Sequence, residues 1–125
     1  MSTLVDTSVL IDVLRGEAAA AEVLRQARTA GPLHASEVTR LEVLVGMRPQ
    51  EEAATRDLLA VFTWHPLDDR VSEIAGDLGR RWLPGDRRID PADLAIAATA
   101  VLLDAELLTR NVKNFPMFSE LSAPY

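Results

Sequence analysis

The chain of 125 residues contains no cysteine, a single lysine and no long apolar run. Without cysteine it has no disulfide bond, no thiolate zinc site and no cysteine nucleophile, which is compatible with a reducing cytosol. Its longest apolar stretch, Leu94 to Leu103, is shorter than the roughly 20 residues that span a bilayer. The first residues carry no basic segment followed by an apolar run, so they do not form a signal peptide. These absences predict a cytoplasmic protein without a membrane anchor.

Basic residues are few and almost all of one kind. The chain has 19 acidic and 13 basic residues and a formal net charge of −6, which argues against nucleic acid as a partner. Twelve of the thirteen bases are arginine, however, and the guanidinium group matches phosphate geometry. Four of them crowd one segment: Arg80, Arg81, Arg87 and Arg88. They form a local phosphate-binding patch or reflect a GC-rich genome, and composition leaves both open.

Short apolar segments alternate with helical ones along the whole chain. The expected strands are at residues 4–5, 33–35, 62–67 and 107–109. The expected helices are at residues 9–14, 17–28, 36–48, 51–61, 68–82 and 90–103. This alternation predicts one α/β domain over residues 1–125, with a mainly parallel sheet covered by helices on both faces.

Glu42 lies in an apolar part of the helix that Ser36 caps. Four side chains are expected on the inner face of this helix: Val38, Leu41, Leu44 and Val45. Glu42 is then close to the core, where an unpaired carboxylate costs several kcal/mol. It requires a metal ion or a salt bridge to Arg40 or Arg48, and we favour the metal ion.

Two further acids stand where a strand ends or a helix begins. Asp6 follows the first strand and precedes Thr7, and Asp93 is near the start of a helix that begins at Asp90-Pro91. Each of them can cap a helix or bind a metal ion. Functional sites of open parallel sheets form outside the carboxyl ends of the strands. We therefore expect Asp6, Glu42 and Asp93 to converge on a divalent cation.

Neutral polar residues follow the last expected strand. The amide oxygens of Asn111 and Asn114 can coordinate magnesium or position a water, and Thr109 can orient a carboxylate or bond a phosphate. Asp12 is expected to be solvated or paired with an arginine. Four other residues are expected to be structural: His34, His65, Trp82 and Tyr125.

Four segments taken together resemble a known family. They are LVDTSVLID at residues 4–12, SEVTRLE at 36–42, DLAIAATA at 93–100 and LTRNVKNF at 108–115. In this order they resemble a PIN domain. The length and layout of the chain are similar to the VapC toxins of bacterial type II toxin–antitoxin pairs, and the resemblance covers essentially the whole chain.

The resemblance implies a flavodoxin-like three-layer α/β/α sandwich and a Mg²⁺-dependent endoribonuclease, with Mn²⁺ as an alternative metal. Its substrate would be structured RNA, either transfer or ribosomal RNA. The implied partners are a small VapB-type antitoxin that inhibits the enzyme and a second copy of the chain. A homodimer with its antitoxin would form a heterotetramer or a larger assembly.

The catalytic and metal-binding acids of the family carry over to Asp6, Glu42 and Asp93. Thr7, Thr109 and Asn111 would support them. Asn111 stands where the family often has a fourth Asp, which favours one strong metal position and a second that is completed by the RNA phosphate. Candidate phosphate contacts are Arg80, Arg81, Arg87, Arg88, Arg110 and Lys113.

Two other functions are compatible with parts of this pattern. One is a catalytically inactive PIN fold that binds RNA or a protein partner. The other is a receiver-like magnesium-binding domain, which requires an acceptor Asp in mid-chain and a lysine late in the sheet. No strand ends in Asp between residues 33 and 67, and Lys113 lies beyond the last strand, so the receiver is the less favoured alternative.

Overall fold

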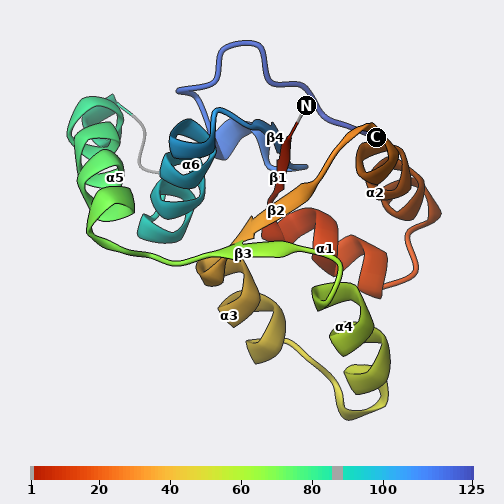
Figure 1. Ribbon diagram of the computed structural model, residues 1–125. Coiled ribbons are helices and arrows are strands. Elements are labelled where there is room, and N and C mark those ends of the chain that lie inside the picture. The colour runs from red at the N-terminus through yellow and green to blue at the C-terminus, as the bar shows by residue number, and fades with distance from the viewer. Residues whose placement is uncertain (1, 86–88) are drawn as a thin grey trace.

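A computed structural model describes residues 2–85 and 89–125, and its centre is a parallel β-sheet (Figure 1). The strands are β1 (Thr3–Val5), β2 (Leu33–Ser36), β3 (Thr63–His65) and β4 (Glu106–Leu108). Their order across the sheet is β3-β2-β1-β4, and every neighbouring pair is parallel. The first strand, β1, is therefore central, with β2 and β3 on one side of it and β4 on the other.

Each parallel connection contains helices, as such crossovers require. The helices are α1 (Thr7–Leu14), α2 (Ala18–Ala30), α3 (Glu37–Val45), α4 (Glu52–Leu59), α5 (Asp69–Trp82) and α6 (Pro91–Leu103). Short 3₁₀ turns occupy Pro49–Glu51, Leu83–Gly85 and Val112–Asn114. The expected α/β class is therefore confirmed. No helix in the described part of the chain is long and apolar enough to cross a membrane.

The sheet has a hydrophobic core on each face. Leu4 packs with Leu94 and Phe115 on the side of α5 and α6, whereas the next residue, Val5, packs with Val9 and Leu24 on the side of α1 and α2. Figure 1 shows α5 and α6 on one side of the strands and α1 and α2 on the other. Burial on both faces is the rule for parallel sheets, and it confirms the three-layer sandwich.

Local capping residues start the helices where the sequence predicts. The Ser36 hydroxyl accepts a hydrogen bond from the Val38 amide at 3.1 Å. At the start of α6, Asp90 accepts from the Asp93 amide at 2.9 Å, and Asp93 accepts from the Asp90 amide at 3.2 Å. This reciprocal capping box, with Pro91 between its members, fixes the direction in which α6 leaves the carboxyl edge of the sheet.

The predicted inner face of α3 is wrong at Leu41 and Val45, whereas Leu44 is partly buried and packs against the core as predicted. Leu41 is 63% exposed and Val45 is 79% exposed, while Thr39 and Val43 are buried. The buried stripe is thus the i, i+4 pair of Thr39 and Val43, and apolar periodicity missed it because Thr39 is polar. Glu42 consequently lies on the exposed side of the helix rather than near the core.

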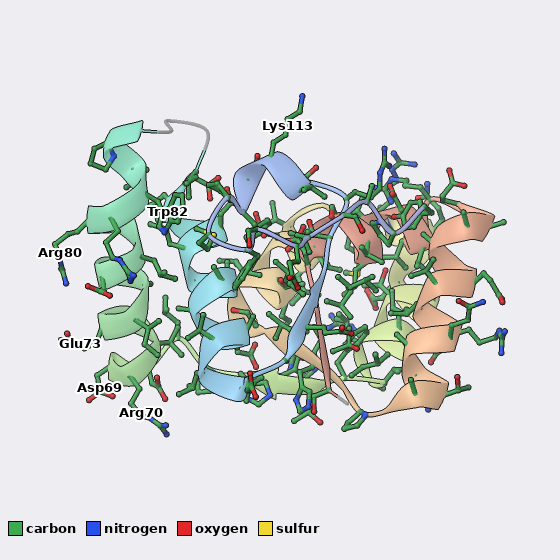
Figure 2. All side chains as sticks on the ribbon, turned by 90° about the horizontal axis from the view of Figure 1, so that it is seen from above. Asp69, Arg70, Glu73, Arg80, Trp82 and Lys113 are labelled. Carbon is green, nitrogen blue, oxygen red and sulfur yellow. The ribbon has the colours of Figure 1, made fainter. Side chains whose placement is uncertain are left out.

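One open alternative is removed and one expectation is corrected. Arg40, considered as a salt-bridge partner of Glu42, donates instead to Glu37 at 2.7 Å one turn earlier in α3. Trp82, expected to be a packing residue, is 37% exposed at the end of α5, and Figure 2 shows it there. The candidate residues Arg87 and Arg88 lie outside the residues that the structure describes.

Candidate functional site

A pocket of about 440 Å³ opens beside the carboxyl ends of β1 and β4. Its lining residues are Asp6, Thr7, Ser8, Ile11, Asp12, Glu42, Asp90, Asp93, Arg110, Asn111 and Asn114. Five of these side chains are carboxylic acids and one is basic. The three acids that the sequence singled out are therefore brought together: Asp6 from the end of β1, Glu42 from α3 and Asp93 from α6.

Asp6 is both a helix cap and part of the pocket wall. It is 4% exposed and is the N-cap of α1. Its Oδ2 accepts hydrogen bonds from the Ser8 hydroxyl and the Thr109 hydroxyl, both at 2.7 Å. The Asp6 amide donates to the Leu108 carbonyl at 2.9 Å, which ties the carboxyl ends of β1 and β4 together. Two hydroxyl donors on one oxygen fix the orientation of the Asp6 carboxylate.

Glu42 reaches the pocket from the exposed face of α3. Its Oε1 accepts a hydrogen bond from the Thr7 hydroxyl at 2.7 Å, and that hydroxyl lies 3.0 Å from the hydroxyl of Thr39. Thr7 therefore joins the first turn of α1 to α3 and holds the glutamate over the pocket. Thr7 was predicted to support the acids, and its hydrogen bond to Glu42 is compatible with that role. The burial argument that singled out Glu42 does not hold, because this residue is exposed.

The carboxyl group of Asp93 has a strongly raised pKa. Burial raises the pKa of its carboxyl group to about 7, and the negative charges of Asp90 and Asp6 add to the increase, while the hydrogen bond from the Asp90 amide opposes it. The side-chain amide of Asn114 (Nδ2) donates to Oδ2 of Asp93 at 3.3 Å. A carboxyl group whose ionised form is disfavoured by burial and by like charge is one that a cation would stabilise.

The segment after β4 supplies neutral polar groups. The Thr109 hydroxyl, fully buried, donates to Asp6 and accepts from the Asn111 amide at 2.9 Å. Asn111 lines the pocket, as expected. Asn114, the other amide predicted beside Asn111, also lines the pocket. Ser8 was not among the predicted site residues, and its signal was position alone, because it follows Asp6 by two residues.

The donor set of the pocket suits a hard divalent cation. Carboxylate and amide oxygens are the ligands of magnesium and manganese. In each of Asp6, Glu42 and Asp93, the described hydrogen bonds involve one carboxylate oxygen, so the second oxygen is available to a metal ion. As the side chains stand, no group of three His, Cys, Asp or Glu residues within 2–85 and 89–125 is close enough to hold one ion. Glu42 is exposed, so rotation of its side chain is the least hindered way to complete such a set.

The predicted phosphate contacts separate into two groups. Arg110 lines the pocket and Lys113 lies in the neighbouring 3₁₀ turn, where Figure 2 shows it pointing to solvent. Arg80 and Arg81 lie on α5, away from the pocket, and approach Asp77 at 3.7 and 3.6 Å. Figure 2 shows Arg80 pointing outward from α5. The structure therefore brings Arg110 to the acidic residues and leaves Arg80 and Arg81 on a separate surface.

Comparison with known proteins agrees with this geometry. The sequence profile of the PIN domain matches residues 3–120. The chain is 43% identical to Ribonuclease VapC19 of Mycobacterium tuberculosis over 123 residues, 98% of each chain. It is also 43% identical to Ribonuclease VapC10 of the same organism over 122 residues, 98% of this chain and 92% of that one. Among solved structures, a toxin–antitoxin complex from Klebsiella pneumoniae contains a chain with 32% identity and a TM-score of 0.79, with 98% of both chains covered. The protein belongs to the PIN domain family and, within it, to the VapC group.

Proposed function

We propose that this protein is a divalent-metal-dependent endoribonuclease and the toxin of a toxin–antitoxin pair. The observation that carries the proposal is the convergence of Asp6, Glu42 and Asp93 on one pocket in a chain that is 43% identical to proteins named ribonucleases. The match to the PIN domain also removes the receiver-like alternative, because the chain belongs to a different family.

In this proposal the three acids hold the metal ion and the hydroxyl groups hold the acids. A bound Mg²⁺ or Mn²⁺ would lower the pKa of a coordinated water and neutralise charge on the phosphate. Ser8 and Thr109 fix Asp6, and Thr7 fixes Glu42. Such second partners orient a ligand and typically change metal affinity or activity about 10- to 100-fold when they are removed.

The pocket acts without a histidine base. None of the described residues that line it is a histidine, and the two histidines of the chain contact each other on β2 and β3, with Nδ1 of His34 2.8 Å from Nε2 of His65. Attack by water rather than by the 2′-hydroxyl therefore fits the pocket best. The expected products carry a 5′-phosphate and a 3′-hydroxyl, and a 2′,3′-cyclic phosphate would contradict this mechanism.

The proposed substrate is structured RNA, transfer or ribosomal, and the proposed inhibitor is a small antitoxin. The related Klebsiella structure is a toxin–antitoxin complex, which supports the partner. The exposed side chains of Leu41 and Val45 lie on α3 next to Glu42, so a partner that covers them would also reach the edge of the pocket. We propose that the toxin itself forms a homodimer and binds its antitoxin in that form.

Cleavage of RNA under controlled metal conditions tests the proposal. Purified protein is incubated with total RNA in Mg²⁺, in Mn²⁺ and in excess EDTA, and the new ends are mapped by sequencing. We expect discrete cuts that require the metal ion and stop when the antitoxin is added. Binding of RNA without any cut in either metal would instead favour the inactive PIN fold.

A further inference from the structure

Three residues from distant parts of the chain meet at the rim of the pocket. Oδ2 of Asp12, in α1, accepts hydrogen bonds from Nη1 of Arg110 and from the hydroxyl of Tyr125, both at 2.6 Å. The guanidinium carbon of Arg110 also lies 5.7 Å from the centre of the Tyr125 ring. We call Asp12, Arg110 and Tyr125 the clasp. It joins α1, the segment after β4 and the last described residues of the chain.

The carboxyl group at the centre of the clasp is largely shielded from solvent. The Asp12 side chain is 19% exposed, whereas that of Arg110 is 51% exposed. Burial opposes the ionisation of Asp12, but the hydrogen bonds from Tyr125 and Arg110 outweigh it and hold the pKa of the carboxyl below its ordinary value. Burial and the hydrogen bond to Asp12 raise the pKa of the Tyr125 hydroxyl, which therefore remains a donor.

Arg110 brings a positive charge to a pocket whose other charged lining residues are acidic. It is the basic residue among the described lining residues, opposite the carboxylates of Asp6, Glu42, Asp90 and Asp93. RNA is a polyanion, and its approach to such a pocket is opposed by these charges. Within residues 2–85 and 89–125 the guanidinium donates to Asp12 alone, so N–H groups on its exposed half are available to a ligand. A guanidinium has five donors and can bridge a carboxylate and a phosphate.

We propose that Asp12 and Tyr125 are positioning residues, which hold the Arg110 guanidinium at the rim so that it binds an RNA phosphate next to the one that is cut. This inference rests on the proposed ribonuclease function. Held by Asp12 and covered by the Tyr125 ring, the arginine loses less side-chain freedom when the phosphate arrives than an unrestrained arginine would. Tyr125 thereby gains a role at the site, beyond the packing role expected from the sequence.

The test is a double-mutant cycle on RNA cleavage and binding. Tyr125→Phe keeps the ring and removes the hydroxyl, Arg110→Ala removes the guanidinium, and the double variant combines them. We expect Arg110→Ala to raise KM about 10-fold with little change in kcat, and to reduce the slope of log Kd against log salt by about 0.7 to 1. Tyr125→Phe should raise KM about 3- to 5-fold in the presence of Arg110 and have no effect in its absence.

Two controls separate positioning from a general loss of structure. Arg70→Ala removes the same charge from the outer surface of α5, where Figure 2 shows this residue, and should leave KM and the salt slope unchanged. Arg110→Lys keeps the charge but not the fork, and should restore the salt slope and only part of KM. Equal effects of Tyr125→Phe with and without Arg110 would overturn the proposal, as would a salt slope that Arg110→Ala does not change.

Binding of the same RNA is measured beside cleavage, with Ca²⁺ in place of Mg²⁺. If the wild-type protein binds RNA in Ca²⁺ but does not cut it in Mg²⁺ or Mn²⁺, the proposed nuclease function fails, and the cycle on Kd still decides the role of the clasp. If the wild-type protein does not bind RNA at all, both proposals are overturned. Thermal unfolding of each variant shows whether a change in Kd follows from a loss of folded protein.

Discussion

The helices α3 and α6 each deliver one acid to the same pocket from opposite environments. Residues 94–100 of α6 are all buried, and Asp93 at its start is fixed by a capping box and by Asn114. On α3, by contrast, Glu42 is exposed between the exposed Leu41 and Val45, and the described contact that holds its carboxylate is the Thr7 hydroxyl. The comparison shows that one pocket combines a partly buried acid held by several hydrogen bonds with an exposed acid held by one. In the proposed metal site, Asp93 would be the fixed ligand and Glu42 the ligand that is free to adjust.

The largest effect on RNA cleavage should come from a change at Asp93. Asp93→Asn keeps the shape and the helix cap but removes the charge, and we expect RNA cleavage to fall about 100-fold or more. Asp69→Asn makes the same change in the first turn of α5, on the outer surface seen in Figure 2, and should retain full activity. Cleavage rates of the two variants in Mg²⁺ show whether the charge of Asp93 is needed for activity. Full activity of Asp93→Asn would mean that this residue is a helix cap only.

The raised pKa of Asp93 predicts a pH dependence of stability in metal-free protein. A carboxyl with a pKa of about 7 when folded and near 4 when unfolded stabilises the fold fully below pH 4, and this contribution is lost as pH rises through 7. We expect a loss of about 1–2 kcal/mol in the unfolding free energy, after allowance for solvent screening. Urea unfolding in EDTA at pH 4.5 and 7.5 measures it.

The variant Asp93→Asn isolates this contribution, because other acids titrate in the same range. The difference in unfolding free energy between wild type and variant should change with pH, in favour of the variant at pH 7.5. Added Mg²⁺ should reverse that order, since a cation stabilises the ionised carboxylate. A difference that stays constant from pH 4.5 to 7.5 would show that Asp93 is not strained by burial and like charge.

The exposed acid, Glu42, should depend on its hydroxyl partner, Thr7. Thr7→Val removes the donor to Glu42 at nearly constant volume, and we expect about 10-fold weaker metal activation of cleavage. Thr7→Ser keeps the hydroxyl and should restore most of it. The half-saturating Mg²⁺ concentration is the measurement. If Thr7→Val has the wild-type value, Glu42 is positioned by something other than Thr7, and the contrast with Asp93 disappears.

The smallest effect should come from the exposed face of α3. Val45→Gln changes a side chain that is 79% exposed, so the unfolding free energy should change by less than about 0.5 kcal/mol. The proposed antitoxin contact, however, should weaken if it covers this face. Thermal unfolding and antitoxin titration measure the two quantities separately. A loss of more than about 2 kcal/mol in stability would show that α3 is packed inward after all.

Much of the fold was predictable because its signals are local. The Asp90-Pro91-Ala92-Asp93 start of α6 and the Ser36 cap of α3 lie within one turn of the helices that they begin. The two faces of α3 were not predictable from apolar periodicity, because its buried stripe contains Thr39 in place of an apolar residue. The acids of the site were found by motif, but the argument for Glu42 from burial was wrong although the residue does line the pocket.

The sequence by itself determined the alternation of strands and helices, the capping residues and the three acids, because periodicity, caps and motifs act over a few neighbouring residues. Only the tertiary structure decided that Thr109 holds Asp6, that Thr7 holds Glu42 and that Tyr125 reaches Asp12. These partners are 103, 35 and 113 residues apart. They meet because the order β3-β2-β1-β4 places the end of β1 between the ends of β2 and β4, and no local pattern encodes that order.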